Sequence, residues 1–291
     1  MEISNGAAGR RPVFQEKKMT YFCTLASGSS GNCAVYVGGR ARILVDAGKN
    51  ARYITENLRR LALSPGELTH ILVTHSHSDH ISALPVLLKH TGAALVCSEE
   101  TLEALAGRLP AGQRVLPFSP GRQLELAGCP VNTFATLHDA PGSCGYVLGE
   151  GREQVAFCTD TGTVTGEIFA AMQGCAAAVL EFNHDAELLK NGPYPYALKL
   201  RILSDQGHLS NRFSAKVAVR LCQEGTRHVT LAHLSRENNT PELAMEALSG
   251  LRGGEVHSSV ILSSVDENTF KKLGMHVTYE PVYQSHSLYH K

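Results

Sequence analysis

Short apolar runs alternate with turns rich in Gly, Ser and Asn along most of the chain, and this pattern predicts strands. The predicted strands are residues 21–26, 34–37, 43–45, 71–74, 114–116, 123–126, 131–136, 145–148, 155–159, 176–182 and 229–232. Apolar residues at helical spacing predict helices over residues 52–63, 83–90, 101–108, 210–221 and 241–251. Because strands precede helices in both halves of the chain, we expect an α/β (α+β) fold with two mixed sheets packed face to face and covered by helices.

Several of these apolar strands end in a polar residue that can take part in chemistry. The strand-end residues are Asp46, His75, Asp160, His184 and His233. A rigid sheet can present functional groups that are gathered at its strand ends. We therefore expect one site along a sheet edge.

The densest group of chemically active residues lies at 75–80, where the sequence reads H-x-H-x-D-H. His75 and His77 are two positions apart and can point the same way from an extended segment, whereas Asp79 and His80 turn toward a second point as a helix begins. Imidazole and carboxylate groups are ligands for transition metals. One short loop can therefore supply ligands to two adjacent metals.

The composition narrows the class of protein. The chain has 291 residues, of which 43% are hydrophobic, and Lys+Arg and Asp+Glu balance at 27 each, so no overall charge indicates an acidic partner. No apolar run approaches about 18 residues, so the sequence predicts no membrane span. The eight cysteines form no C-x-x-C pair, which indicates free thiols in a reducing cytosol and a cytoplasmic protein.

Three further residues complete a site for two metals. His138 and His233 add one imidazole each, and Asp160 can bridge two ions through its two oxygens. The expected ligand sets are His75, His77 and His138 for one ion and Asp79, His80 and His233 for the other. Donors of this kind accept zinc, manganese or iron, so we expect two divalent metal ions as cofactors.

In the order of these motifs the chain resembles the metallo-β-lactamase superfamily. The motifs are Asp46, H-x-H-x-D-H at 75–80, His138, Asp160 and His233. The resemblance implies a four-layer αββα sandwich with two metals at one sheet edge. It also implies that Asp46 orients the loop at residues 75–80, here called the His loop, without binding metal. We expect residues 1–18 to be a disordered leader and residues 19–291 to form a single metallo-β-lactamase-fold domain.

Within that superfamily the chain is similar to the YycJ/WalJ branch. The similarity lies in L-A-S-G-S-S-G-N at residues 25–32, G-H-L-S-N at 207–211 and H-L-S-R-E-N-N at 233–239. The branch is associated with DNA exonuclease activity in the 5′-to-3′ direction and is related to the RNase J and RNase Z phosphodiesterases. The resemblance therefore implies a metal-dependent hydrolase with a nucleic acid substrate, DNA above all.

Two interpretations of His208 stay open. It either contacts substrate or transfers a proton, as a catalytic residue beside Asp79 and Asp160, or it is a structural residue at a helix start. Residues 27–32 are likewise either a hairpin turn or a phosphate-binding loop. The candidate substrate residues are Ser29, Asn32, His184, Asp185, Ser210, Asn211, Ser235 and Asn238. Residues 184–220 carry six basic against three acidic side chains, which indicates either phosphate binding or a solvated helix face.

The hypothesis from sequence is a dinuclear phosphodiesterase in which a hydroxide shared by the metals attacks phosphorus. A carbonyl hydrolase acting on a thioester, lactone or lactam with the same metals is the main alternative, and an RNA-processing nuclease is a close one. His77 disfavours a redox di-iron protein of this fold, which usually carries Glu at that place. The complete ligand set disfavours a binding module without catalysis.

Overall fold

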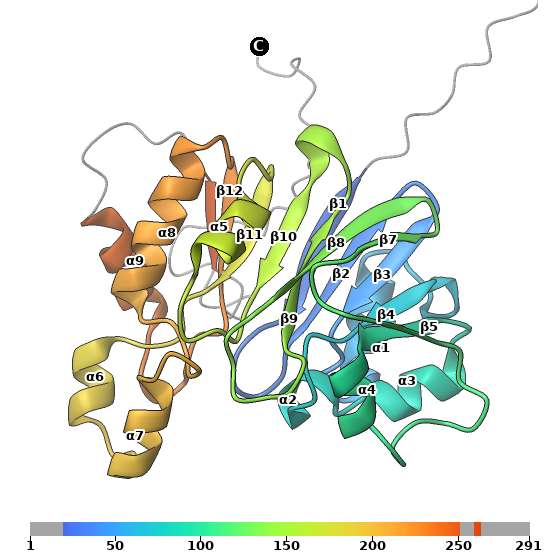
Figure 1. Ribbon diagram of the computed structural model, residues 1–291, viewed down its shortest axis with the longest axis horizontal. Coiled ribbons are helices and arrows are strands. Elements are labelled where there is room, and N and C mark those ends of the chain that lie inside the picture. The colour runs from blue at the N-terminus through green and yellow to red at the C-terminus, as the bar shows by residue number, and fades with distance from the viewer. Residues whose placement is uncertain (1–19, 251–258, 263–291) are drawn as a thin grey trace, which may run out of the picture.

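The computed structural model describes residues 20–250 and 259–262, and within them two mixed sheets pack face to face (Figure 1). One sheet has six strands in the order β1-β2-β3-β4-β5-β6, and the other has seven in the order β13-β12-β11-β10-β9-β8-β7. The strands are β1 (Tyr21–Ala26), β2 (Cys33–Gly38), β3 (Ala41–Val45), β4 (His70–Leu72), β5 (Ala94–Ser98), β6 (Val115–Phe118), β7 (Gln123–Leu126), β8 (Cys129–Ala135), β9 (Cys144–Leu148), β10 (Val155–Cys158), β11 (Ala177–Glu181), β12 (His228–Ala232) and β13 (Ser259–Leu262). The predicted leader, residues 1–18, lies outside the described residues.

Helices cover the outer face of each sheet, which confirms the expected αββα layering (Figure 1). The helices are α1 (Ala51–Arg60), α2 (Ser78–Ile81), α3 (Leu84–His90), α4 (Glu99–Ala104), α5 (Gly166–Met172), α6 (Ala186–Asn191), α7 (Tyr196–Ile202), α8 (Asn211–Gln223) and α9 (Pro241–Ser249), with short 3₁₀ turns η1 (Pro65–Glu67) and η2 (Gly151–Glu153). None of the helices in the described part of the chain has the length and apolar character needed to cross a bilayer.

The hydrophobic core follows these layers. Ile43 and Tyr146 are buried between the two sheets, where they belong to one continuous cluster. Leu58 and Leu95 belong to a second cluster between α1, α3 and the six-stranded sheet, and Leu221 to a third between α5, α8, α9 and the seven-stranded sheet. Burying a side chain of this size stabilises the fold by about 1.5–3 kcal/mol. The sheets are therefore a rigid base for groups at their edges.

Some elements differ from those predicted by the apolar pattern. The helix predicted over 101–108 begins at Glu99, because the Ser98 side chain caps it by accepting a hydrogen bond from the backbone N–H of Thr101. Strand β5 and helices α5, α6 and α7 were not predicted. Helices α6 and α7 have six and seven residues and form a hairpin beyond the sheet edge (Figure 1).

Strand direction decides where the functional groups meet. Strands β3, β4 and β5 are parallel in one sheet, and β10, β11 and β12 are parallel in the other. The carboxyl ends of parallel neighbours lie at the same edge of a sheet. The segments that follow β3, β4, β10, β11 and β12 therefore converge.

Candidate metal centre and active site

The predicted strand-end residues meet where these edges adjoin. Asp46 follows β3, the H-x-H-x-D-H loop at 75–80 follows β4, and His138 lies in the segment between β8 and β9. Asp160 and His233 follow β10 and β12 of the other sheet. Both sheets thus contribute to one buried cluster of imidazoles and carboxylates.

Three residues of this cluster have left-handed backbone conformations. Asp46, Asp160 and His233 have φ angles of 60°, 57° and 58°. A residue with a Cβ loses about 1–2 kcal/mol in this region, although Asp and His occupy it more often than most residues do. Such conformations cluster at functional sites. Each one turns the chain sharply just past a strand and keeps the functional side chain at the sheet edge.

The donor atoms form overlapping groups in which each residue offers one atom within 4.8 Å of the others. The groups are His75, His77 and His138; Asp79, His80 and His233; His75, His80 and Asp160; and Asp160, Glu181, His208 and His233. The first two groups coincide with the ligand sets predicted from the sequence. Asp160 belongs to the two remaining groups and so lies between the predicted sets.

The chemistry of this cluster fits divalent metal ions. Nε2 of His75 and Nε2 of His233 are buried, and neither has a hydrogen-bond partner among the described residues. A buried polar atom without a partner is costly unless a ligand satisfies it. Imidazole nitrogen and carboxylate oxygen are the donors that zinc, manganese and iron accept. The residues present therefore fit a metal centre.

Without metal, this cluster holds protons. Burial lowers the pKa of His233, but the carboxylates of Asp160, Asp79 and Glu181 outweigh burial and raise it to about 10. Burial raises the pKa of Asp79, and the adjacent imidazole rings of His233 and His80 bring it well below its usual range. Metal ligands must be deprotonated to bind. Metal and protons therefore compete for the same nitrogens, and acid weakens metal binding.

Glu181, which the sequence analysis did not predict as a site residue, joins two histidines of the site. It is the last residue of β11 and is fully buried, and its Oε1 accepts hydrogen bonds from Nδ1 of His208 at 2.8 Å and Nδ1 of His233 at 2.9 Å. Its Oε2 accepts from the backbone N–H groups of Thr161 and Leu209. Burial raises the pKa of Glu181, yet His208 and His233 lower it to about 2, so the carboxylate stays ionised.

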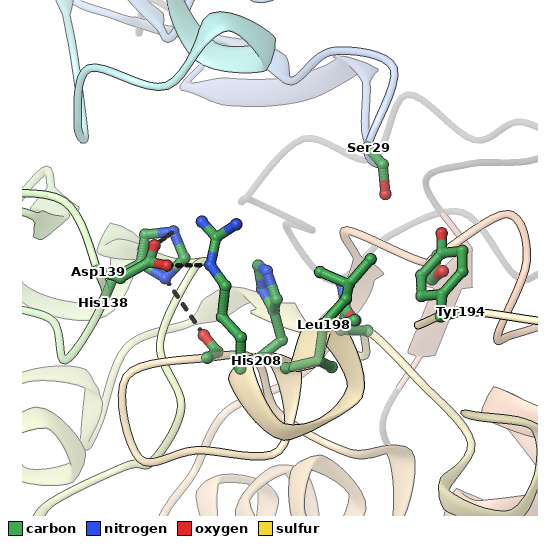
Figure 2. Close-up of a pocket in the computed structure, with 11 residues that line it drawn as sticks. Ser29, His138, Asp139, Tyr194, Leu198 and His208 are labelled. Atoms are coloured by element: carbon green, nitrogen blue, oxygen red, sulfur yellow. Dashed lines mark hydrogen bonds and ion pairs between the residues drawn. The ribbon is translucent and has the colours of Figure 1, made fainter. Parts of the chain in front are cut away.

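A pocket of about 190 Å³ opens beside this cluster (Figure 2). Its walls come from both sheets and from the α6–α7 hairpin, and they include Ser29, His138, Asp139, Tyr194, Leu198, Arg201, His208 and Ser235. Nδ1 of His138 donates to the carbonyl oxygen of Gly207 at 3.2 Å, and Arg201 of α7 forms an ion pair with Asp139. That ion pair fastens the α7 wall to the segment that carries His138.

A family model for the β-lactamase superfamily domain matches residues 41–234 of the chain. The chain belongs to the metallo-β-lactamase superfamily. Exodeoxyribonuclease YycJ of Bacillus anthracis is 37% identical over 233 residues, which cover 79% of this chain and 88% of that protein. Exodeoxyribonuclease WalJ of Streptococcus pneumoniae serotype 2 (strain D39 / NCTC 7466) is 36% identical over 228 residues, which cover 77% of this chain and 84% of that protein. These relatives confirm the predicted YycJ/WalJ branch.

Solved structures share this superfamily's fold with the chain. The metallo-β-lactamase fold protein YhfI of Bacillus subtilis superposes with a TM-score of 0.65 at 14% identity, covering 84% of this chain and 96% of that one. Zinc-bound PqqB of Methylobacterium extorquens superposes with a TM-score of 0.64 at 13% identity, covering 84% and 98%. At such low identities the likeness concerns the fold alone.

Asp46 of this metallo-β-lactamase-fold chain lies behind the His loop. Its Oδ2 accepts a hydrogen bond from Nδ1 of His80 at 2.7 Å, and its Oδ1 accepts from the backbone N–H of Thr74 at 2.8 Å. Nε2 of His80 then faces Oδ2 of Asp160 at 3.2 Å. A carboxylate that accepts from one ring nitrogen fixes the tautomer and leaves the other nitrogen for a metal.

We expect Asp46→Asn to weaken metal affinity by roughly 10- to 100-fold, because an amide accepts less strongly from the His80 ring than a carboxylate does. Titration of zinc against a competing chelator measures this change. Glu103→Gln replaces an exposed carboxylate on α4 and serves as the control for the same chemical change. Equal affinities in Asp46→Asn and the parent protein would show that Asp46 does not support the site.

The candidate substrate residues divide between the pocket and the structure around it. Ser29 and Ser235 line the pocket, whereas the other six have contacts elsewhere. Asn32 lies 2.9 Å from Nε2 of His80, in the metal centre. Asp185 and Ser210 cap helices α6 and α8, and buried His184 forms a backbone β-bridge with Ser210. Asn211 is hydrogen-bonded to Asn239, and the backbone N–H of Asn238 donates to Oγ of Ser235. His208 lines the pocket, so its helix-start position does not remove it from the site.

The basic residues predicted to bind phosphate are likewise divided. Arg201 pairs with Asp139, Nζ of Lys199 donates to the carbonyl oxygens of Lys190 and Gly192, and Arg220 lies over the Phe169 ring. These three cations serve contacts within the protein. The other three basic side chains of the segment, those of Lys190, Arg212 and Lys216, have neither an ion pair nor a hydrogen bond in the described part of the chain.

Proposed function

We propose that this chain is a metal-dependent phosphodiesterase that degrades DNA from an end, with two divalent ions bound in the cluster. The observation that carries the proposal is the complete donor set with His208 beside it, in a chain 37% identical to a protein named exodeoxyribonuclease. Neutral overall charge does not oppose a nucleic acid substrate, because local patches supply the attraction. A cytoplasmic location and digestion from the 5′ end belong to the same proposal.

The ligand sets follow from the donor groups. His75, His77 and His138 would hold one ion. Asp79, His80 and His233 would hold the other, with Asp160 between the two sets. When bound, divalent ions of this kind supply a Lewis acid for the phosphoryl oxygen and lower the pKa of bound water. Zinc, manganese and iron all suit these donors.

The protein itself supplies a proton donor. Nδ1 of His208 donates to Glu181, so the ring is held with its other nitrogen free to act at the pocket wall. Burial lowers the pKa of His208, but the Glu181 carboxylate outweighs burial and raises it, which favours the protonated ring. His208 then transfers the proton at Nε2 to the leaving oxygen of the cleaved phosphodiester.

The pocket walls select the end of a strand. Tyr194 presents an aromatic ring, and aromatic rings stack on bases without regard to sequence. Ser29 and Ser235 place hydroxyl groups in the same pocket, where they can bond to sugar or phosphate. The Tyr194 and Leu198 wall comes from the α6–α7 hairpin (Figure 2). A wall formed by this hairpin would favour cutting at a strand end over cutting within a duplex.

Digestion of end-labelled oligonucleotides tests the proposal. Single- and double-stranded DNA and RNA, labelled at the 5′ or the 3′ end, are incubated with protein loaded with zinc, manganese or iron. We expect mononucleotides to be released from the 5′ end of DNA. Efficient cleavage of a thioester or lactam with no cleavage of any oligonucleotide would replace this function by carbonyl hydrolysis, and preferential cleavage of RNA would replace DNA as the substrate.

A further inference from the structure

Two cations outside the metal centre share a single hydroxyl group. Nζ of Lys49 lies 2.6 Å from Oγ of Ser30, and a guanidinium nitrogen of Arg236 lies 2.9 Å from the same oxygen. Ser30 belongs to the loop between β1 and β2, Lys49 to the segment between β3 and α1, and Arg236 to the segment after β12. Three segments from both sheets thus bring two positive charges together.

This pair of cations has no acidic partner in the described part of the chain: no ion pair of Lys49 or Arg236 with a carboxylate is recorded there. Like charges a few ångströms apart repel each other. Burial lowers the pKa of Lys49, and the neighbouring Arg236 guanidinium lowers it further. An anion that bound between the two cations would remove this repulsion.

Close backbone packing positions the segment that carries Lys49 beside the loop that carries Ser30. Gly31 has a φ angle of 137°, and a Cβ there would lie 2.2 Å from the carbonyl oxygen of Gly48. A Cβ on Gly48 would lie 1.6 Å from the carbonyl oxygen of Asp79. The loops therefore pack backbone against backbone, and only glycine permits this approach. Lys49, which follows Gly48, is fixed relative to Ser30 by the same packing.

The loop that carries Ser30 also reaches the metal centre and the pocket. Oγ of Ser27 accepts a hydrogen bond from the backbone N–H of His233 at 2.6 Å. Ser29 lines the pocket together with Ser235, the neighbour of Arg236 in the chain. The cation pair therefore lies next to the part of the pocket wall that Ser29 and Ser235 form.

We propose that Lys49, Arg236 and Ser30 form a subsite for a phosphate group of the nucleic acid strand, distinct from the phosphate that is cut. Two cations and a hydroxyl match the charge and the several acceptor oxygens of a phosphate, and phosphate contacts of this kind fix the register of a strand. The subsite rests on the proposed function, and it sets which phosphodiester reaches the metals. The bound group is either an internal phosphodiester or a terminal phosphate.

The test uses Lys49→Gln, Arg236→Gln and the double variant in metal-loaded, full-length protein. Binding of a cleavage-resistant phosphorothioate oligonucleotide is measured by fluorescence anisotropy over a range of salt concentrations. We expect each substitution to weaken binding about tenfold, as loss of a charged hydrogen bond does. The slope of log affinity against log salt should fall in magnitude by about 0.7–0.9 for each cation removed. The matched control is Arg152→Gln. Arg152 is an exposed arginine in η2, which precedes β10 and so lies at the opposite end of that strand from Asp160.

Turnover of a small phosphodiester distinguishes a defect in the subsite from a defect in the metal centre. Bis(p-nitrophenyl) phosphate has no neighbouring phosphate, so the variants should turn it over at the rate of the parent protein. Metal content and unfolding temperature equal to those of the parent protein exclude misfolding of the variants. Oligonucleotides with a 5′-phosphate or a 5′-hydroxyl distinguish the two sources: a loss confined to the former assigns a terminal phosphate, and a loss with both assigns an internal one.

Unchanged affinity and salt slope, or an equal loss with the small substrate, would overturn the subsite. If the variants bind oligonucleotide more weakly but the parent protein cleaves none, the subsite stands while the nuclease function fails.

Discussion

Asp160→Asn should lower turnover by more than about 100-fold, beyond the usual loss for a residue that only orients a ligand, and should loosen at least one metal ion. Asp160 is buried and belongs to donor groups that contain His75 of one predicted ligand set and His80 and His233 of the other. Loss of its charge therefore affects both ligand sets. Metal content measured by mass spectrometry, together with turnover of a labelled oligonucleotide, reports both effects.

The choice of asparagine matters because the backbone at Asp160 is left-handed, with a φ angle of 57°. Asparagine tolerates this conformation, whereas alanine adds backbone strain to the loss of charge. Asp160→Ala should therefore lose the same activity and also unfold at a lower temperature. Two ions retained with full turnover in Asp160→Asn would refute a bridging role.

His208→Ala should lower kcat on an oligonucleotide by about 10²–10⁴-fold while metal content stays unchanged, because general acid catalysis is worth about that much. His208 is absent from the two predicted ligand sets, and its Nδ1 is taken by Glu181. Glu181→Gln should lower both kcat and metal affinity, since the same carboxylate oxygen also accepts from His233. Comparing kcat with metal content in the two variants separates these roles.

The leaving group offers a sharper measurement of the role of His208. A nucleotide oxygen must be protonated as it leaves, whereas p-nitrophenolate is stable as an anion. A general acid is therefore needed for DNA and dispensable for bis(p-nitrophenyl) phosphate. We expect His208→Ala to lose far more activity on DNA than on the small substrate, and equal losses on both would contradict proton donation by His208.

Most of the sheet framework could be predicted from the sequence, because apolar runs bounded on both sides by turn residues have few other structures. The strands around Ile43, Tyr146 and Phe157 are of this kind. Strand β5 was missed although all five of its residues are buried, since a short apolar run between two helices has no period of its own. The α6–α7 hairpin was missed because Pro193 and Pro195 interrupt a segment whose helices are short.

The candidate metal donors could be predicted from the sequence, because most of them follow apolar strands or lie in the regularly spaced segment 75–80. Glu181 was not predicted, although a signal existed: a carboxylate at the end of a wholly apolar strand must have a partner when buried. Glu181 ends the same apolar strand that precedes His184, so its position alone indicates a site residue. Ser30, Lys49 and Arg236 carried no such signal, because their proximity depends on how three loops pack.

The division of the donors between the two sheets has a consequence for the protein's lifetime. His75, His77, Asp79 and His80 follow a strand of one sheet, whereas His138, Asp160 and His233 come from the other. A ligand that binds the folded chain alone stabilises it in proportion to the logarithm of its concentration. Ions held across this boundary would link the two sheets and stabilise their packing. Starvation for metal would then shorten survival against proteases as well as stop catalysis.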